Sequence, residues 1–223
     1  MKGLAAIVRA LRDKRRQRRF PGSRAYWEKR YAKGGDSGTG SHAHLATAKA
    51  HFLNEFVERT HVQSVVDLGC GDGNQLELFR FPSYIGVDVA EQVIVKNRRR
   101  FQKDRVRFLT TEEWISLPPV ERTAELALSL DVVYILVEND VFEQYMRGLF
   151  SSASRYVIVY SSNWDEVGKD KHVRHRRFTD WVDEHLAGWV LKEEVPNRFK
   201  YVRGNPGTSP SSFFIYERAA GSP

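Results

Sequence analysis

The sequence predicts an α/β fold in which helices cover both faces of a mostly parallel sheet, and three observations support it. An apolar run over residues 64–68 is typical of a short buried strand. Three glycines at alternate positions follow it over 69–73, and residues 75–79 can begin a helix, so strand, glycine turn and helix start a βαβ unit. Strand-like apolar runs and amphipathic helical segments then alternate as far as residue 217.

The remaining elements follow in chain order from the same two periodicities. A helix over 45–58 is predicted because Leu45, Ala48, Phe52 and Phe56 recur at helical spacing. Further strands are expected over 83–88, 106–109, 125–131, 156–160, 189–195 and 212–217, and further helices over 91–100, 141–150 and 178–186. The last two of these seven strands form a hairpin-like pair, and a polar loop spans 161–177.

The ligand of the glycine turn is the first functional question. Dinucleotide-binding proteins use G-x-G-x-x-G, and from Gly69 the third glycine position of that pattern holds Asn74. The turn also carries Asp67 and Asp72, and negative side chains suit a cationic, hydrogen-bond-donating ligand better than a pyrophosphate. A redox enzyme is therefore a distant alternative, which failure to bind NAD(H) would dispose of.

A different glycine pattern is complete in this stretch. Asp67, Gly69, Gly71 and Gly73 fill D-x-G-x-G-x-G, and Asp88 ends the next strand about twenty residues after the first glycine, the spacing of a ribose-binding acid. The stretch resembles motif I of the class I S-adenosylmethionine-dependent methyltransferases. The resemblance covers residues 45–218 and implies a seven-stranded, mostly parallel Rossmann-like methyltransferase sheet with its last strand antiparallel, preceded here by an N-terminal helical arm.

The resemblance also implies the cofactor, S-adenosyl-L-methionine, with S-adenosyl-L-homocysteine as product. In the family the glycine loop approaches the methionine part and Asp88 takes the ribose hydroxyls. A polar residue after the third strand meets the adenine, a role for Thr111 or Glu112, although this chain departs there from the commoner aspartate. The cofactor-binding residues expected on this basis are Asp67, Gly69, Cys70, Gly71, Gly73, Asp88, Val89, Thr111, Glu112 and Leu130.

Charge is unevenly distributed along the chain. Residues 1–33 carry twelve Lys or Arg against Asp13 and Glu28, whereas the remaining residues carry 23 basic and 26 acidic side chains. The net charge of +7 therefore comes from the N-terminal arm, which weakens any argument that the whole fold binds nucleic acid. A helix over 1–20, ended by the Pro-Gly pair at 21–22, suits an anionic membrane or nucleic-acid surface. A solvated arm and a helix packed on its own domain are the alternatives.

A chain of 223 residues is expected to form one domain with an appendage. We divide it into a basic N-terminal helical arm (1–33), a glycine-rich lid loop (34–44), a class I methyltransferase domain (45–218) and a tail (219–223). The lid follows from the resemblance, because the region before motif I commonly covers cofactor and substrate in that family. A disordered linker is its alternative.

Cysteine content and hydropathy indicate the compartment. The single cysteine, Cys70, excludes an internal disulfide framework and fits a reducing environment. No apolar run is long enough to span a membrane, and the N-terminus lacks the apolar core of a signal peptide. We expect a cytoplasmic protein, with membrane association through the N-terminal arm as an alternative. The sequence leaves the oligomeric state open.

Candidate catalytic residues follow the fourth and fifth strands, because ligands of open α/β sheets lie beyond the carboxyl ends of the strands. Transfer to a hydroxyl needs a base or a metal, and histidine is the usual base at neutral pH. The catalytic candidates are Asp131, His172 and His175. On a helical turn the two histidines would share a face; a basic surface loop is the alternative.

Substrate contacts are expected from the same two segments, at Tyr134, Glu138, Asn163 and Arg174. We assign no metal ligands, although Asp131 and Glu138 lie near one strand end and leave Mg²⁺ open.

The acceptor is inferred from the resemblance, and the residues at the end of the fourth strand count against one class of acceptor. Enzymes of this superfamily that methylate amino groups of DNA bases or proteins carry [DN]-P-P-[FY] there, whereas this chain has Ser129-Leu130-Asp131-Val132. The chain carries in order W-E-x-R-Y, G-G-x-S-G-x-G-S, G-C-G-D-G-N-Q, S-L-D-V-V-Y and H-V-R-H-R-x-F. This whole pattern looks like small bacterial methyltransferases of sugar and polysaccharide modification. It implies O-methylation of a hydroxyl on a sugar, glycan or related small metabolite. An RNA methyltransferase anchored by the basic arm and a non-catalytic cofactor-binding scaffold are the alternatives.

Overall fold

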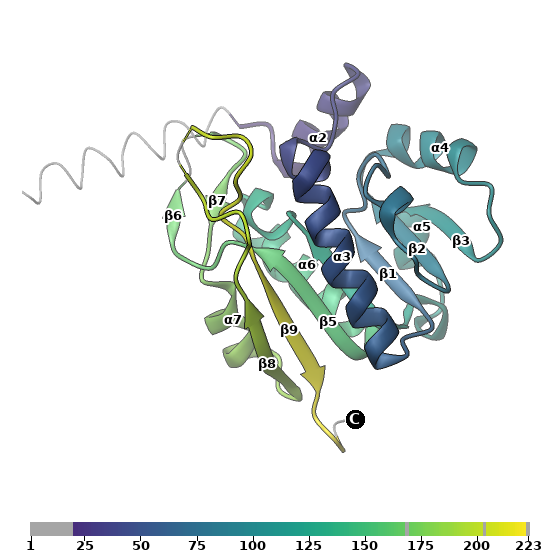
Figure 1. Ribbon diagram of the computed structural model, residues 1–223. Helices are drawn as coiled ribbons and strands as arrows, with labels where there is room; N and C mark the ends of the chain where they lie inside the picture. The colour runs from purple at the N-terminus through teal and green to yellow at the C-terminus, as the bar shows by residue number, and fades with distance from the viewer. Residues whose placement is uncertain (1–19, 168–169, 203, 222–223) are drawn as a thin grey trace, which may run out of the picture.

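The computed structural model describes residues 20–167, 170–202 and 204–221 (Figure 1). The helix predicted over 1–20 lies almost wholly outside these residues. The strands of the main sheet are β1 (Val65–Leu68), β2 (Tyr84–Asp88), β3 (Val106–Thr110), β4 (Ala124–Leu130), β5 (Ala153–Ser161), β8 (Trp189–Val195) and β9 (Ser212–Arg218). Their order is β3-β2-β1-β4-β5-β9-β8. β1 to β5 pair in parallel and β9 runs antiparallel to both its neighbours. The predicted sheet, with its last strand antiparallel, is confirmed.

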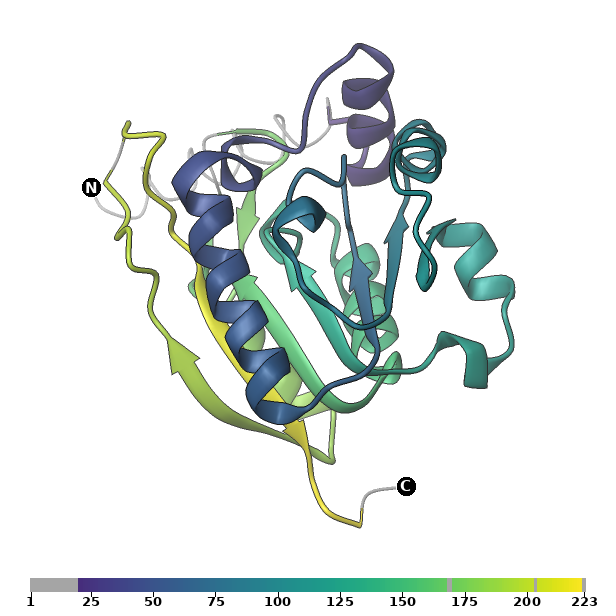
Figure 2. The ribbon, with the colours of Figure 1, turned by 45° about the vertical axis from the view of Figure 1, so that its right-hand side comes forward.

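Both faces of the sheet are apolar. Successive side chains of each strand point to opposite faces, and helices cover both of them. In β4, Leu126 and Leu128 belong to one buried layer and Ala127 to the other. The helices are α2 (Ser23–Ala32), α3 (Ala43–Thr60), α4 (Glu91–Arg100), α5 (Thr111–Ser116), α6 (Asn139–Ser151) and α7 (Phe178–His185). α3 and α4 cover the first layer, and α5, α6 and α7 cover the second; Figure 2 shows α3 in front of the sheet and α6 behind it.

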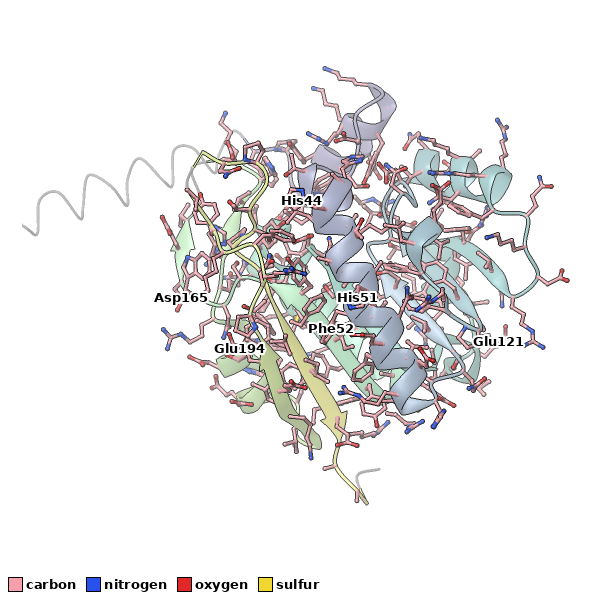
Figure 3. The ribbon with its side chains drawn as sticks, viewed as in Figure 1. His44, His51, Phe52, Glu121, Asp165 and Glu194 are labelled. Carbon is pink, nitrogen blue, oxygen red and sulfur yellow. The ribbon has the colours of Figure 1, made fainter. Side chains whose placement is uncertain are left out.

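α3 packs on the sheet through the apolar positions that predicted it. Leu45, Leu53 and Phe56 are buried, and the ring of Phe52 stacks on Phe213 of β9 with centroids 4.0 Å apart. Figure 3 labels Phe52 on this helix. The helix ends where His61 adopts a left-handed conformation. No helix in the described ranges is both long enough and apolar enough to cross a membrane.

The helix predicted to begin over 75–79 is wrong. Only a single 3₁₀ turn, Leu76–Leu78, forms between β1 and β2. Asn54 of α3 donates to Leu78 O (2.9 Å) and accepts from Arg80 N (2.8 Å), so this side chain satisfies backbone groups that a longer helix would have paired internally. The segment therefore returns to β2 as a loop pinned to α3.

The short helix α5 was not predicted, and two further elements near the end of the sheet were not predicted either. Residues 23–32 of the arm form α2, and the polar loop 161–177 contains a short hairpin of β6 (Glu166–Val167) and β7 (Arg174–His175). Figure 1 shows both near the end of the sheet to which the parallel strands point. In a fold of this kind that carboxyl edge is where ligands bind.

Candidate active site

The glycine turn after β1 has a backbone that only glycine fits. Gly69, Gly71 and Gly73 have φ values of 87°, 57° and 74°, which L-residues with a Cβ rarely adopt. A Cβ at any of the three would lie within 3 Å of a neighbouring side chain; at Gly71 it would lie 2.3 Å from Ser37 Oγ. Asn97 of α4, which the sequence did not single out, supports the turn by donating to Gly71 O at 2.8 Å.

Asp88 joins the end of β2 to this turn. Its Oδ2 accepts from Gly71 N (3.0 Å), and its Oδ1 accepts from Ala90 N (2.9 Å). Burial raises the pKa of Asp88 to about 6, against the lowering effect of these backbone hydrogen bonds. Each oxygen keeps a second lone pair, so the carboxylate can still accept from vicinal hydroxyls such as those of a ribose.

Asp67 lies within β1 and is buried. Tyr84 donates to its Oδ2 at 2.9 Å, whereas its buried Oδ1 has no hydrogen-bond partner among the described residues. Burial raises the pKa of this carboxyl group to about 7, opposed by the Tyr84 hydrogen bond and by Lys49. An unpaired buried oxygen is costly, so a cationic donor beside it would be favoured. Together with the turn and Asp88, this orphaned oxygen fits the amino and ribose groups of S-adenosylmethionine.

The other expected cofactor residues surround the same turn. Burial raises the pKa of the Cys70 thiol, which therefore stays protonated and acts as a small packed side chain. Leu130 belongs to the apolar layer under α3 and α4. Val89 follows Asp88 directly in the chain, and its contact with the cofactor stays a prediction.

Thr111 and Glu112 begin α5 directly after β3. Thr110 and Glu113 form a capping box that fixes this helix start. Glu112 is exposed and pairs with Arg24 of α2. The adenine contact assigned to Thr111 or Glu112 stays a prediction.

The segment expected to be a lid lies against the glycine turn. Ser37 N donates to Asp72 Oδ2 (3.1 Å), and Asp72 N donates to Ser37 Oγ (2.9 Å). The Tyr31 hydroxyl is 3.0 Å from Ser37 Oγ. Further along, a Cβ at Gly40 would lie 2.6 Å from Asp131 Oδ2. The segment thus contacts both the turn and the end of β4, as a lid requires, and its opening and closing stay a prediction.

Asp131 follows β4 and takes part in a buried ion pair. Lys49 Nζ of α3 lies 2.6 Å from its Oδ2, with the side chains 2% and 14% exposed. Tyr134 and Ser211 donate hydroxyl hydrogens to its Oδ1, each at 3.1 Å. Its φ of 63° is strained for a residue with a Cβ. Asp131 is therefore held on both oxygens, which suits an anchor better than a free base.

Sequence reasoning missed Lys49, although a signal existed. Lys49 stands four residues from both Leu45 and Leu53, on the apolar face of α3. A lysine in the middle of a buried stripe indicates an ion partner, since a lone buried ammonium is costly.

The two candidate histidines lie on the hairpin segment, which is the described part of the predicted loop (residues 161–167 and 170–177), and not on a helical turn. His175 Nδ1 is 2.6 Å from Ser162 Oγ, and its ring stacks on Trp164 with centroids 4.9 Å apart. His172 instead stacks on Tyr26 of α2 at 4.5 Å. Burial lowers the pKa of both histidines, with Glu166 opposing the shift at His175, so both are neutral at pH 7.

Three expected substrate residues already have protein partners. Glu138 accepts hydrogen bonds from the backbone N–H (2.8 Å) and the hydroxyl (2.6 Å) of Ser23, and these bonds hold the start of α2 to Glu138. Asn163 accepts from the backbone N–H of Thr179 in the first turn of α7 (3.3 Å). Arg174 donates to Val137 O (3.1 Å). These contacts explain the three side chains structurally, and their contact with substrate stays a prediction, as does that of Tyr134.

The Mg²⁺ alternative receives no support. Within residues 20–167, 170–202 and 204–221, no group of three or more His, Cys, Asp or Glu side chains is placed to hold a metal ion. The two carboxylates that left the question open are separately engaged, Asp131 with Lys49 and Glu138 with Ser23.

No protein-family model and no curated protein sequence matches the chain. Solved structures do match it. Magnesium protoporphyrin IX methyltransferase (ChlM) from Synechocystis PCC 6803 with bound SAH is 14% identical, with a TM-score of 0.58 over 78% of this chain and 83% of that one. The methyltransferase domain of bacterial CtHen1-C is 18% identical, with a TM-score of 0.59 over 78% and 98% of the two chains.

The mitomycin 7-O-methyltransferase MmcR is 16% identical, with a TM-score of 0.54 over 78% of this chain and 54% of that one. At such identities the likeness concerns the fold. The strand order and the glycine turn are those expected from motif I. The chain therefore has the Rossmann-like fold of class I S-adenosylmethionine-dependent methyltransferases.

Proposed function

We propose that this protein is an S-adenosylmethionine-dependent methyltransferase. The observation that carries the proposal is the pair of buried carboxylates, Asp67 and Asp88, on either side of a turn that admits only glycine. One oxygen of Asp67 has no partner within the described ranges, and an ammonium would supply one. A solved structure of similar fold, ChlM from Synechocystis PCC 6803, has been crystallised with SAM.

The residues in and beside the turn would each have a distinct task. Asp88 accepts from the ribose hydroxyls, Asp67 accepts from the amino group, and Gly71 lets the ligand approach the backbone closely. The bound cofactor supplies an electrophilic methyl group on a sulfonium sulfur. The protein then has to align the acceptor and take its proton.

The acceptor group of this proposal is a hydroxyl, and His175 is its base. The imidazole is neutral at pH 7 because burial lowers its pKa. Its Nδ1 is engaged by Ser162 Oγ, which leaves Nε2 to take the acceptor proton as the acceptor oxygen receives the methyl group. Asp131 and His172 position neighbouring groups in this scheme, Asp131 through Tyr134 and His172 through Tyr26.

The acceptor molecule is inferred less directly. The resemblance favours a sugar, glycan or related small metabolite, and one neighbour of similar fold is named as a 7-O-methyltransferase. RNA is the second candidate, because the basic arm 1–33 is suited to a polyanion and another neighbour is named as a small RNA methyltransferase. A scaffold that binds the cofactor without turnover is the third.

Calorimetric titration with S-adenosylmethionine, S-adenosylhomocysteine and NADH tests the cofactor. We expect micromolar binding of the first two and none of NADH. Asp88→Asn should weaken binding at least tenfold, since the amide loses the charge and one acceptor position. The exposed Asp104 provides the matched control, and Asp104→Asn should leave binding unchanged. Absence of binding in folded protein would refute the proposal.

A further inference from the structure

Positive charge is concentrated in one short stretch of the folded domain. Residues 96–107, which run from the second half of α4 into β3, carry five arginines and two lysines against one acid, Asp104. The formal net charge of this stretch is therefore +6. Residues 20–223 as a whole have a net charge of zero, because residues 1–19 account for the +7 of the chain. The rest of the domain is thus acidic on balance, and this stretch stands out from it.

The structure exposes this charge at one edge of the sheet. Val93, Ile94 and Asn97 on the inner face of α4 are buried, whereas Lys96 and Arg99 are exposed. At 3.6 residues per turn, these two side chains point away from the buried face of the helix. β3 is the terminal strand of the main sheet, and Figure 1 shows it with α4 at one side of the molecule. We define the α4 patch by four exposed cations of α4 and of the turn that follows it: Lys96, Arg99, Lys103 and Arg105.

The α4 patch differs from its flanks in having no ion partner. On the flanks, Arg98 Nη2 lies 2.5 Å from Glu113 Oε2, and Arg100 Nη2 lies 2.7 Å from Glu77 Oε1. Among the residues that the structure describes, no ion pair joins a side chain of the patch to a carboxylate. Like charges held on one surface repel each other, and a bound anion would relieve that repulsion. The charge of the patch is therefore available to an external partner.

Arg105 adds an observation from the backbone. Its φ of 66° is left-handed, a conformation that favours glycine over residues with a Cβ. The carbonyl of Arg105 accepts from Tyr84 N at 2.9 Å, which holds this turn to the start of β2. The turn itself would therefore be served better by glycine. A role of the side chain outside the fold accounts for an exposed arginine at this strained position.

The α4 patch adjoins two features already described. From the inner side of α4, Asn97 donates to Gly71 O, and Arg100 donates to Asn74 Oδ1 at 2.9 Å, so the helix that carries the patch also supports the glycine turn. On another side, α4 packs against α2, which belongs to the basic arm 1–33. The patch therefore continues the positive charge of the arm onto the folded domain.

We propose that the α4 patch binds the phosphate backbone of a nucleic acid. Ammonium and guanidinium groups bind phosphate oxygens through charge-assisted hydrogen bonds, and arginine can do so with two N–H groups at once. Several cations spread over one exposed surface suit a polymer that carries a charge on every nucleotide. The proposal concerns a surface outside the candidate active site, and it does not depend on the methyltransferase proposal.

An anionic membrane is the competing partner, and α4 lacks the apolar surface that a membrane requires. A helix that lies on a membrane buries an apolar face at the boundary between headgroups and acyl chains. The apolar face of α4 is already packed in the core through Val93 and Ile94, and Val95, 37% exposed, is the one large apolar side chain that the helix exposes. Lipid would be held by charge alone, so the patch favours a nucleic acid.

The test measures the fluorescence anisotropy of a labelled oligouridylate of about 20 nucleotides with the full chain at several salt concentrations. The patch variant replaces all four cations by Gln. Loss of up to four phosphate contacts should flatten the slope of log K against log salt concentration by up to about 3, and raise the dissociation constant at least tenfold at about 0.1 M salt. The matched control loses the same charge from exposed residues of α3, α6, β5 and β8: Arg59→Gln, Arg147→Gln, Arg155→Gln and Lys192→Gln. Residues 1–19 are unaltered in both variants, so a difference between them reports the patch.

Two outcomes overturn the proposal. One is an equal loss of affinity in the patch variant and in the control, because total charge would then explain the effect. The other is absence of oligouridylate binding by the unaltered protein; sedimentation with phosphatidylserine vesicles that only the patch variant loses would then assign the surface to a membrane. Urea denaturation of both variants checks folding, and Lys96→Gln combined with Arg99→Gln is a milder second variant, expected to flatten the slope by up to about 1.4. Titration with S-adenosylhomocysteine tests the methyltransferase proposal separately, so either proposal can fail without the other.

Discussion

Lys49 and Asp131 are coupled so closely that removing one leaves the other charged and buried. Losing one partner of a buried pair typically costs about 3–5 kcal/mol. We therefore expect Lys49→Met to lower the free energy of unfolding by about that amount, measured by urea denaturation. The exposed Lys96 of α4 gives the control, and Lys96→Met should change stability by less than about 0.5 kcal/mol. Equal stabilities of the two variants would contradict the role given to the pair.

Ser162 is the residue through which His175 would be oriented. With Nδ1 donating to Ser162 Oγ, the lone pair of Nε2 faces away from the serine and can take a proton. Ser162→Ala should lower kcat roughly 10–100-fold while the affinity for S-adenosylmethionine stays unchanged. Ser162→Thr keeps the hydroxyl and should restore most of the rate. A purely structural role would be indicated if both variants lost the same activity.

Asp67 and Asp88 make cofactor binding depend on pH. Burial raises their pKa values to about 7 and about 6, so both carboxyl groups are protonated at pH 5 and ionised at pH 8. An ammonium and ribose hydroxyls bind the ionised forms better, so affinity should fall as the pH falls through this interval. Asp67 also faces Lys49 and Tyr84, which both act to lower its pKa.

Calorimetry between pH 5 and pH 7.5 measures the effect of that ionisation. The stability of the unliganded protein should follow the opposite trend. Because the folded-state pKa values of these two carboxyl groups exceed the unfolded ones, their contribution to stability is present at low pH and is lost as the pH rises to about 7. Asp67→Asn should flatten the pH dependence of binding, and a steep dependence in that variant would contradict the assignment.

At the scale of elements, the glycine turn and the segment over it act as one unit. Gly71→Ala would place a methyl group on a left-handed backbone and against Ser37 Oγ. We expect the variant to bind S-adenosylhomocysteine at least tenfold more weakly. Gly148→Ala is the matched control, because nothing lies within 4 Å of its added methyl group in the last turn of α6, where alanine should stabilise the helix by up to about 1 kcal/mol.

Ser37→Gly added to Gly71→Ala removes the clash but not the backbone strain, so it should recover part of the lost affinity. Full recovery would show that the close approach of the segment, and not the left-handed backbone, accounts for the glycine. No recovery would show the reverse.

The sequence predicted the features that depend on residues close together in the chain, and it missed those that depend on residues far apart. β1, the turn and β2 were predictable because motif I and Asp88 lie within 24 residues whose conformation is set locally by glycine and by apolar runs. The failed helix over 75–79 shows the limit, because Asn54 decides that segment from another element. The Lys49–Asp131 pair spans 82 positions, and the hairpin of β6 and β7 forms from residues with no alternating pattern.

At the scale of the whole molecule, the same division applies to the site. Its acids and glycines are contiguous in sequence, whereas its aromatic groups are assembled from α2, the end of β4 and the hairpin segment. Such groups form only through tertiary packing, and no spacing in the sequence indicates that Tyr26 and His172 will meet. The glycine turn and the acids beside it were therefore accessible to sequence reasoning, whereas the aromatic partners of His172 and His175 were not.

The net positive charge of the whole molecule is carried by its N-terminal residues and not by the part of the chain that holds the candidate site. Residues 1–19 carry eight Lys or Arg and one Asp, so the residues from 20 onward have a formal net charge of zero. If the basic N-terminal arm binds RNA, the affinity for a single-stranded RNA oligonucleotide should fall steeply as the salt concentration rises. Each phosphate that the protein neutralises adds about −0.7 to the slope of log K against log salt concentration. Replacing Arg15, Arg16, Arg18 and Arg19 by Gln should flatten that slope by up to about 3 and leave S-adenosylhomocysteine binding unchanged. Gel-shift titrations at several salt concentrations measure the slope, and an unaltered slope in the variant would move the RNA contact from the arm to the folded domain.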